Sequence, residues 1–430
     1  MSDGRAPATA GLPDAIAQAA SEVGEMLAAS DRALQADYLG DRPGRQPVHT
    51  AYVPADLFHP DLAADWGRQA LQALADCASS AAEFGAAMDL PDELAAIVRE
   101  RVEAKLSSEP IEDLRLDFED GYKPAGDADA AEDTDALSAA RDLRAAATSG
   151  SAPPFTGIRC KSLEAPSRLR AIRTVTLFLQ ELLAHGPMPA GFVLTLPKVT
   201  SADQVKAMAL LCDRLEQAFG LPGGKLTFEI QAETPQLILS ADGTATIARC
   251  VHYGGDRLTG VHYGTYDYAA ALGIAGEFQR LDHPAADHAR QIMQVAVAGT
   301  RVRLSDGSLN VLPTGSRADV VAAWRQHSRL VRRALERGFY QGWDLHPAQL
   351  ASRYAATYGF FVGGAPRACD RLRNYTESAS TGTLEEPATA RALSGFLLRG
   401  LDCGALTETD ISERCGLGRA ALSALGEARR

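Results

Sequence analysis

Charged and amide side chains follow a series of short apolar segments in this sequence, where each segment gives way to a polar or glycine-containing stretch. The residues that share this position are Glu119, Asp120, Arg159, Lys198, Gln231, Glu233, Asp267 and His346. Polar groups that end otherwise apolar strands are typical of a site at one mouth of a barrel. The sequence contains no Ser/His/Asp set, HExxH motif, Walker loop or Cys/His pair. The candidate chemistry therefore rests on carboxylates and cations.

Glu233 and Asp267 end consecutive apolar segments, which places them on neighbouring strands with backbones about 5 Å apart. Two carboxylates without a matching cysteine or histidine suit a hard, oxygen-preferring cation such as Mg²⁺. Few protein ligands are usual for Mg²⁺ because it keeps water and substrate oxygens around it. Either acid could instead cap a helix or form a salt bridge, so spacing alone leaves the metal site as one of two interpretations.

Arg159 in GIRCKS could hold a carboxylate through two parallel hydrogen bonds and offset developing negative charge, or it could be solvated. Asp117 and Glu119 alternate with apolar residues and share one face of a strand, where acids require a cation, an arginine or a shared proton. Lys198 after LTLP could pair with one of these acids. His346 could be a general base or a hydrogen-bonded structural residue.

Eight short apolar segments, most of them followed by a helical pattern, predict strands that alternate with helices. They are residues 49–55, 113–122, 155–163, 191–199, 225–235, 258–268, a weaker one near 308–315, and 342–350. Eight parallel βα units close into an α/β (β/α)₈ TIM barrel, in which catalytic groups lie at the carboxyl ends of the strands. An open doubly wound sheet is less favoured because no GxGxxG motif follows an early strand.

The barrel domain is expected to span residues 49–354, with helical additions at three places. Residues 1–48 are Ala-rich and predict an N-terminal helical segment. Residues 58–108 predict a long helical pair inserted after the first strand, and residues 355–430 predict a helical C-terminal extension. Because helices added to a barrel usually cap it or mediate association, a homo-oligomer is expected.

Composition and charge argue against several classes of function. The 430-residue chain has a formal net charge of −12, which predicts no basic surface for nucleic acid or anionic lipid. No segment approaches the roughly 18 apolar residues of a membrane helix, and the N-terminus lacks the pattern of a signal peptide. The seven scattered cysteines argue against a disulfide framework or a zinc site. We expect a reduced, cytoplasmic protein.

The strand ends, in this order, resemble those of the HpcH/HpaI aldolase and citrate lyase β-subunit superfamily over residues 50–350. The similar segments are AYVPA, LDFEDGY, GIRCKS, LTLPKV, IQAETPQLI, HYGTYDYAAALG and GFYQGWDLHPAQL. The resemblance places the family's substrate-binding arginine on Arg159 and its metal ligands on Glu233 and Asp267. The sequence departs from the family at residues 161–162, where Lys-Ser replaces an asparagine, and in HYGTY before Asp267. It therefore resembles a divergent member.

The resemblance implies a carbon–carbon lyase or aldolase that depends on Mg²⁺, with Mn²⁺ as a second usable metal. Its substrate would be a 2-oxo or hydroxy carboxylic acid, free or as a CoA thioester, and the reaction would pass through a metal-stabilised enolate. The base would be a metal-bound hydroxide, an acid of the Glu119/Asp120 pair, or His346, while Lys198 keeps a Schiff-base route open. The residues expected to contact the substrate beside Arg159 are Gln231, Thr265 and Tyr266.

Two further enzyme functions and one other role stay open on the sequence. A malate-synthase-like condensation and phosphoenolpyruvate chemistry use a related enolate. A barrel kept as a regulatory or assembly subunit is the alternative outside enzymes, with the helical extensions as its working surface.

Overall fold

Eight parallel strands form a closed barrel at the centre of the protein. The structure, a computed structural model, describes residues 12–124, 126–377 and 386–427. The strands follow one another around the barrel in chain order, and β1 pairs with β8 to close it. They are β1 (Thr50–Pro54), β2 (Asp113–Asp117), β3 (Phe155–Arg159), β4 (Phe192–Leu196), β5 (Thr227–Ala232), β6 (Leu258–Tyr263), β7 (Arg303–Ser308) and β8 (Gln341–Asp344). The predicted (β/α)₈ barrel is confirmed.

The barrel interior is unusually polar. Successive side chains along each strand point alternately into the interior and toward the helices, and the polar ones point inward. Side chains point to opposite faces at successive positions of a strand. Arg115 of β2 donates to Thr195 of β4 and Glu229 of β5 across the interior, at 2.9 Å each. Neighbours such as Leu116 and Leu194 point the other way and are buried in the apolar core that surrounds the barrel. The strands thus present apolar side chains to the helices and polar ones to the interior.

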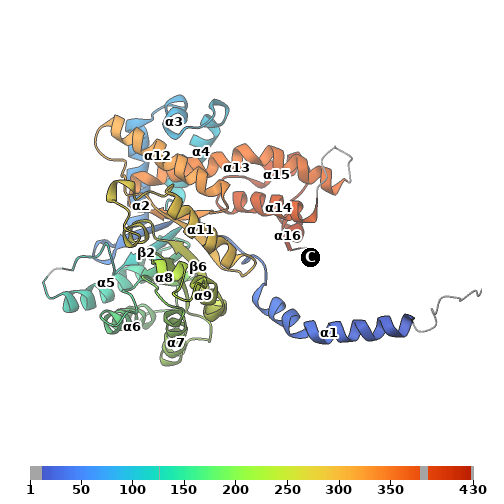
Figure 1. The fold of residues 1–430 in the computed structure, drawn as a ribbon. Helices are drawn as coiled ribbons and strands as arrows, with labels where there is room; N and C mark the ends of the chain where they lie inside the picture. The colour runs from blue at the N-terminus through green and yellow to red at the C-terminus, as the bar shows by residue number, and fades with distance from the viewer. Residues whose placement is uncertain (1–11, 125, 378–385, 428–430) are drawn as a thin grey trace, which may run out of the picture.

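Helices connect the strands and cover the outside of the barrel (Figure 1). They are α5 (Ala128–Ser149), α6 (Arg168–Ala184), α7 (Ala202–Phe219), α8 (Pro235–Ile238), α9 (Thr246–Gly254), α10 (Thr265–Ala271), α11 (Pro284–Val297) and α12 (Arg317–Glu336). Short 3₁₀ turns occur at Ala55–Leu57, Gly255–Arg257 and Gly276–Phe278. A capping box begins α7: the Gln204 side chain accepts hydrogen bonds from the backbone N–H groups of Thr200 and Ser201.

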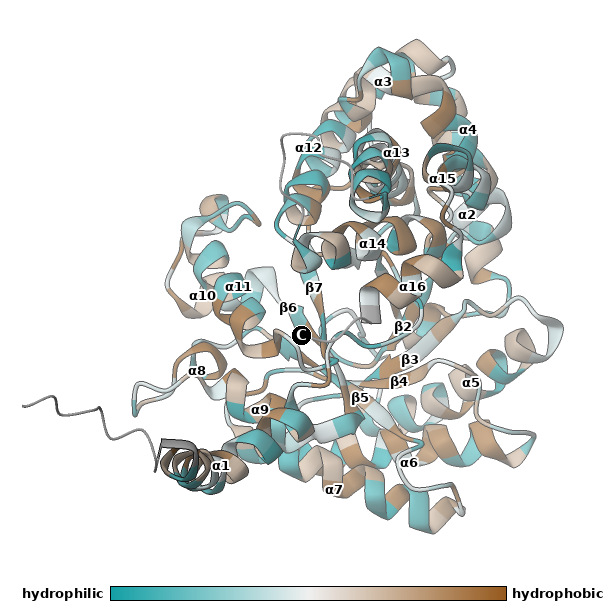
Figure 2. Ribbon diagram, turned by 90° about the vertical axis from the view of Figure 1, so that its right-hand side faces the viewer, coloured by the Kyte–Doolittle hydropathy of each residue, from teal (hydrophilic) through white to brown (hydrophobic). Residues whose placement is uncertain are grey.

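A second helical layer is built from both ends of the sequence. The segment after β1 forms α2 (Leu62–Cys77), α3 (Ala81–Met88) and α4 (Asp92–Ser108), three helices rather than the expected pair. They pack with α13 (Pro347–Thr376), which is followed by α14 (Pro387–Asp402), α15 (Glu408–Cys415) and α16 (Arg419–Glu427). In Figures 1 and 2 these helices gather on one side of the barrel and α5–α9 on the other. Because α13 runs through residue 354, the boundary placed there stays a prediction.

The N-terminal helix α1 (Leu12–Asp37) projects away from the barrel (Figure 1). The chain after it crosses the amino end of the barrel, where Gly40 bridges to Thr300 and Gln46 Nε2 donates to the Leu304 carbonyl at 3.1 Å. No helix in the described ranges combines the length and the apolar composition needed to cross a membrane.

The seventh strand lies earlier than the sequence predicts, and the prediction near residues 308–315 is wrong. β7 occupies Arg303–Ser308 and contains the buried acid Asp306. Arg290 of α11 donates to both Asp306 oxygens, at 2.6 and 2.8 Å, so the burial of this carboxylate is compensated. Because Arg290 pairs with Asp306, β7 can bury a polar side chain and contains few apolar residues. It therefore lacks the run of apolar residues that marks the other strands in the sequence.

Candidate functional site

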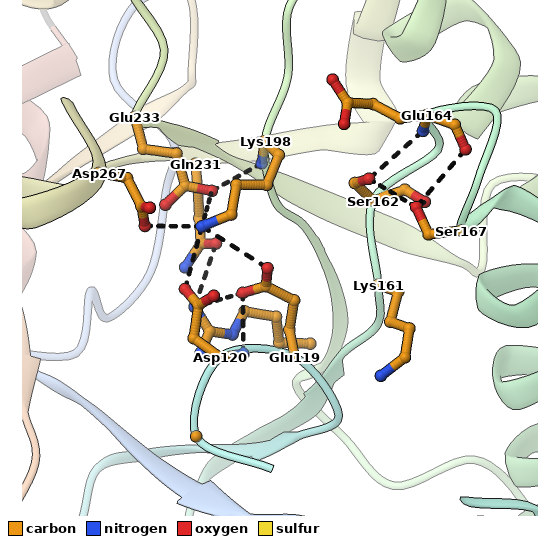
Figure 3. Close-up of polar contacts among 12 residues, drawn as sticks. Glu119, Asp120, Lys161, Ser162, Glu164, Ser167, Lys198, Gln231, Glu233 and Asp267 are labelled. Atoms are coloured by element: carbon orange, nitrogen blue, oxygen red, sulfur yellow. Dashed lines mark hydrogen bonds and ion pairs between the residues drawn. The ribbon is translucent and has the colours of Figure 1, made fainter. Parts of the chain in front are cut away.

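Four carboxylates surround the ammonium group of Lys198 at the carboxyl end of the barrel (Figure 3). Lys198 Nζ lies 2.6 Å from Asp267 Oδ2 and 3.1 Å from Asp120 Oδ2. It lies 3.6 Å from Glu119 Oε1 and 3.9 Å from Glu233 Oε1. These residues follow β2, β4, β5 and β6, so four connections bring them together. The structure thus gathers five of the residues selected from the sequence.

Lys198 reaches this position through an unusual backbone conformation. Its φ is +53°, a left-handed value that costs a non-glycine residue on the order of 1–3 kcal/mol. The Lys198 backbone N–H donates to Glu233 Oε1 at 2.6 Å. The same turn therefore fixes the Glu233 carboxylate from the backbone and brings the Lys198 ammonium over it.

Glu233 is 2% exposed, and Gly264 at the end of β6 makes the room for it. A Cβ at Gly264 would lie 2.7 Å from Glu233 Oε2, well inside van der Waals contact. A glycine is therefore required here by close approach. Sequence reasoning missed this role, although Gly264 stands in the HYGTYD segment three residues before Asp267.

Arg159 is held by Asp117 in a buried bidentate pair. Arg159 Nε and Nη2 donate to the two Asp117 oxygens at 2.6 Å each. Asp117 also accepts the backbone N–H groups of Glu119 at 2.9 Å and Gly121 at 3.0 Å. The carboxylate thus orients the guanidinium and shapes the acidic turn after β2 at the same time.

The remaining nitrogen of Arg159 faces the Lys198 cluster. Arg159 Nη1 lies 3.4 Å from Gln231 Oε1, 3.4 Å from Glu119 Oε2 and 3.7 Å from Asp120 Oδ2. The guanidinium also lies over the Tyr52 ring, 4.9 Å from its centroid, in a cation–π contact. One edge of Arg159 is therefore fixed, and the other is directed toward the carboxyl mouth.

Negative charge exceeds positive charge in this cluster, because Asp117 neutralises Arg159 and four carboxylates face Lys198. Burial raises the pKa of Glu119 to about 8 and that of Glu233 to about 7, against the lowering effect of Arg159 and Lys198. Burial also acts on Asp120, but a hydrogen bond with Glu119 and the charges of Arg159 and Lys198 hold its pKa below the usual value. An added cation would stabilise all four ionised carboxylates.

Glu233 and Asp267 fit a small hard cation by donor type. They offer only carboxylate oxygens, and the Lys198 ammonium already lies between them as a bound positive charge. Across residues 12–124, 126–377 and 386–427, no group of three or more His, Cys, Asp or Glu is arranged to hold a metal. Since Mg²⁺ takes as few as one or two carboxylates and keeps water, the two-residue set is compatible with it.

The other predicted site residues make contacts outside the cluster. His346 caps α13, with its Nδ1 accepting the Ala348 N–H at 3.2 Å, and burial lowers its pKa. Thr265 Oγ1 donates to the Ser308 carbonyl at 3.2 Å, and the Tyr266 hydroxyl accepts the Asn310 N–H at 2.7 Å. These contacts hold the connections after β6, β7 and β8, and none of them involves Lys198.

The chain matches a family described as Domain of unknown function (DUF6986) over residues 27–430. It belongs to that family. A crystal structure of a citrate lyase from Burkholderia xenovorans LB400 has a TM-score of 0.56 at 16% identity, covering 86% of this chain and 96% of that one. The expected likeness to citrate lyase is confirmed at the level of the fold, which is what a likeness at this identity shows.

Two more distant structures extend the comparison. Haloferax volcanii malate synthase has a TM-score of 0.49 at 12% identity, covering 90% of this chain and 100% of that one. CitE from Mycobacterium tuberculosis, in complex with magnesium, acetoacetate and coenzyme A, has a TM-score of 0.46 at 17% identity, covering 84% and 99%. No curated protein sequence matches the chain.

Asp117 and Tyr52 also belong to this site, although neither was among the site residues predicted from the sequence, where Asp117 was recognised only as an acid that requires a partner. Asp117 carried a usable signal, since it alternates with Glu119 on one face of an apolar strand. Tyr52 carried none, because an aromatic residue inside a buried strand is typical of a core position.

Proposed function

We propose that this protein is a lyase or aldolase that makes or breaks a carbon–carbon bond next to the carboxylate of a 2-oxo or hydroxy acid. One observation carries the proposal: four carboxylates, Lys198 and the open edge of Arg159 converge at the carboxyl end of the barrel. That end is where (β/α)₈ barrels place their catalytic groups. A citrate lyase with the same fold supports the reaction class.

In this proposal Arg159 binds the substrate carboxylate. Asp117 occupies Nε and Nη2, which leaves Nη1 to donate to an incoming oxygen. Because the guanidinium is 5% exposed, its charge is little screened and acts strongly on a nearby anion. Gln231, 3.4 Å from Nη1, holds that nitrogen in place before the substrate arrives.

Glu233 and Asp267 hold a divalent cation, with Mg²⁺ the preferred ion and Mn²⁺ a substitute. The ion would supply positive charge beside the substrate carboxylate and its adjacent oxygen, where negative charge develops during the reaction. Gly264 leaves the space that Glu233 needs, and the Lys198 backbone orients its carboxylate. In the absence of the ion, the Lys198 ammonium group offsets the negative charge of the same two carboxylates.

Asp120 is the residue best placed to move a proton. Its carboxylate is half-exposed and lies 3.7 Å from Arg159 Nη1, so it borders the space beside a bound carboxylate. Glu119 is more buried and lies next to it, with its side chain accepting the Asp120 backbone N–H at 3.0 Å. Asp120 therefore accepts the proton, and Glu119 positions it. His346 is not assigned to this step because its ring caps α13.

Proton exchange at the carbon next to a keto group tests this function. Pyruvate or oxaloacetate is incubated with the protein in deuterated buffer, with Mg²⁺ or with chelator, and followed by NMR. We expect exchange or cleavage that requires both the protein and Mg²⁺. If neither acid shows Mg²⁺-dependent exchange or cleavage, the proposed chemistry on simple 2-oxo acids is refuted.

Substitution of Asp267 tests the metal site separately from turnover. Asp267→Asn should weaken Mg²⁺ or Mn²⁺ binding at least tenfold in calorimetry. Its melting temperature in chelator should stay near wild type, because the Asp267 side chain is 45% exposed. Asp203→Asn, at an exposed surface pair with Lys206, is the control and should bind the metal normally. A large loss of stability in chelator would instead give Asp267 a structural role.

A further inference from the structure

A cavity of about 500 Å³ lies at the amino end of the barrel, opposite the carboxyl mouth. The first residues of several strands line it, among them Asp113 of β2, Thr227 of β5 and Arg303 of β7. The segment from Arg42 to Pro47, which follows α1, forms another part of the wall. The volume is in the range of small-molecule sites, about 300–1,000 Å³.

Unpaired positive charge distinguishes this cavity from the rest of an acidic protein. Arg42, Arg301, Arg303 and Lys225 all line it. Within the described ranges none of the four forms an ion pair with a carboxylate. Arg42 Nε donates to the Arg301 carbonyl at 3.0 Å, and Arg303 Nη2 donates to the Gly44 carbonyl at 2.8 Å. Carbonyl oxygens satisfy these donors, but no carboxylate forms an ion pair with either guanidinium in the described ranges.

Arg301 is the residue whose side chain the protein itself does not use. In the part of the chain that the structure describes, its guanidinium donates no hydrogen bond, and its Nε is buried without a partner. A buried donor left unpaired costs about 1–3 kcal/mol, so such donors usually have a partner. Arg301 Nε therefore has hydrogen-bonding capacity that the described chain does not use.

The inner wall of the cavity does not offset the positive charge. Arg115 is paired with Asp113 and Glu229, and His262 Nε2 lies 2.9 Å from Glu229 Oε2. The acids are thereby engaged with cations of the barrel interior. His262 is 2% exposed, and its Nδ1, like Nε of Arg45, is a further buried polar atom of the lining without a hydrogen-bond partner. The cavity therefore combines free positive charge at its rim with unused hydrogen-bonding capacity in its wall.

The positively charged side chains at the rim of the cavity repel one another, and this repulsion affects the pKa of Arg303. Burial, together with the nearby charges of Arg42 and Arg399, lowers the pKa of Arg303 to about 10. Asp402 and Asp41 act in the opposite direction but do not restore the pKa to its ordinary value. A bound anion would remove this repulsion.

We propose that the amino-end cavity binds a small oxyanion with two or more negative charges, a phosphate ester or a polycarboxylate, through Arg42, Arg301 and Arg303. Guanidinium groups match phosphate and carboxylate oxygens in charge and geometry. This site is separate from the reaction proposed at the carboxyl mouth. Because its ligands come from the segment after α1 and from the start of β7, the anion joins these two parts of the chain.

Direct binding to the metal-free protein tests the site. Inorganic pyrophosphate and citrate serve as separate probes in calorimetry and thermal melting, with sodium chloride at matched ionic strength as reference. We expect saturable binding of at least one probe, with a rise in melting temperature that chloride does not reproduce. Pyrophosphate binding indicates phosphate recognition, and citrate binding indicates polycarboxylate recognition. If neither probe binds saturably, the proposal is overturned.

Arg301→Gln identifies the site of binding. Since the Arg301 side chain donates no hydrogen bond in the described chain, the variant should melt like wild type without an anion and bind the probe at least tenfold more weakly. The control is Arg317→Gln, an exposed residue paired with Glu83, which should bind the probe like wild type. Equal affinity of Arg301→Gln and Arg317→Gln would place the bound anion elsewhere and overturn the assignment.

Discussion

His327 of α12 is buried against Ser352 and Arg353 of α13. Its Nδ1 lies 2.8 Å from Ser352 Oγ, and its Nε2 lies 3.4 Å from Arg353 Nη2. Nε2 also lies 3.4 Å from Asp344 Oδ1. Burial and the charge of Arg353 lower the pKa of His327 to about 3. The imidazolium is therefore strongly disfavoured in the folded state.

The sign and size of the pH effect follow from this lowered pKa. An unfolded histidine titrates near 6.5, so the unfolded chain takes up the proton first as the pH falls. Stability is lost below pH 6.5 and continues to fall until about pH 3. The loss is about 1.4 kcal/mol per pH unit, or about 2 kcal/mol between pH 7 and pH 5. Arg353 and His49 hold the pKa of Asp344 below its usual value despite its burial, so Asp344 stays ionised in the folded and the unfolded protein between pH 7 and pH 5.

The assay compares urea unfolding of wild type and His327→Gln at pH 7 and pH 5. The glutamine keeps an amide near Ser352 and Arg353 but has no titrating group. The free energy of unfolding of wild type, relative to the variant, should fall by about 2 kcal/mol between the two pH values. His185→Gln, at an exposed position, should follow wild type at both. An equal wild-type-to-His327→Gln difference at pH 7 and pH 5 would refute the reasoning.

Three other substitutions test the site and its support. Arg159→Lys keeps the charge but loses the directed Nη1 donor, so kcat/KM for the reaction identified should fall roughly 10²- to 10³-fold, and a loss below tenfold would contradict the assigned role. Gly264→Ala should displace Glu233 and weaken Mg²⁺ binding, measured by calorimetry, at least tenfold. Gly260→Ala is the control, because its added Cβ meets only ordinary van der Waals contacts, and it should leave the affinity for Mg²⁺ unchanged. Glu112→Gln breaks a buried ion pair with α4 and should lower the free energy of unfolding by about 3 kcal/mol in urea; a loss under 1 kcal/mol would count against it.

The sequence was sufficient for the fold wherever apolar residues mark the strands. The segments around β2 and β5 combine apolar runs with polar ends, and both strands lie where they were predicted. β7 was misplaced because its buried Asp306 depends on Arg290, a residue on another element. A pairing of this kind leaves no periodic signal in the strand itself.

The proximity of two site residues could be predicted from the sequence only where the pairing register of two neighbouring strands determines it. Asp117 and Arg159 are direct neighbours across β2 and β3, so the position of each at a strand end already implies their proximity. The central place of Lys198 depends on a left-handed turn that its side chain does not favour. The amino-end cavity was not predictable, since Arg42 and Arg301 are 259 positions apart and meet through a crossing segment.

The closure of the barrel by β1 and β8 has a consequence for the synthesis of the chain. The first strand and helices α2 and α4 leave the ribosome before their partners β8 and α13, which are made roughly 240 to 290 residues later. Tyr354 of α13 donates to the Pro110 carbonyl at 3.0 Å, a contact that spans 244 positions. During translation the early elements therefore keep apolar surface exposed until α13 emerges. Truncation before β8 removes the strand that pairs with β1 and leaves the barrel open.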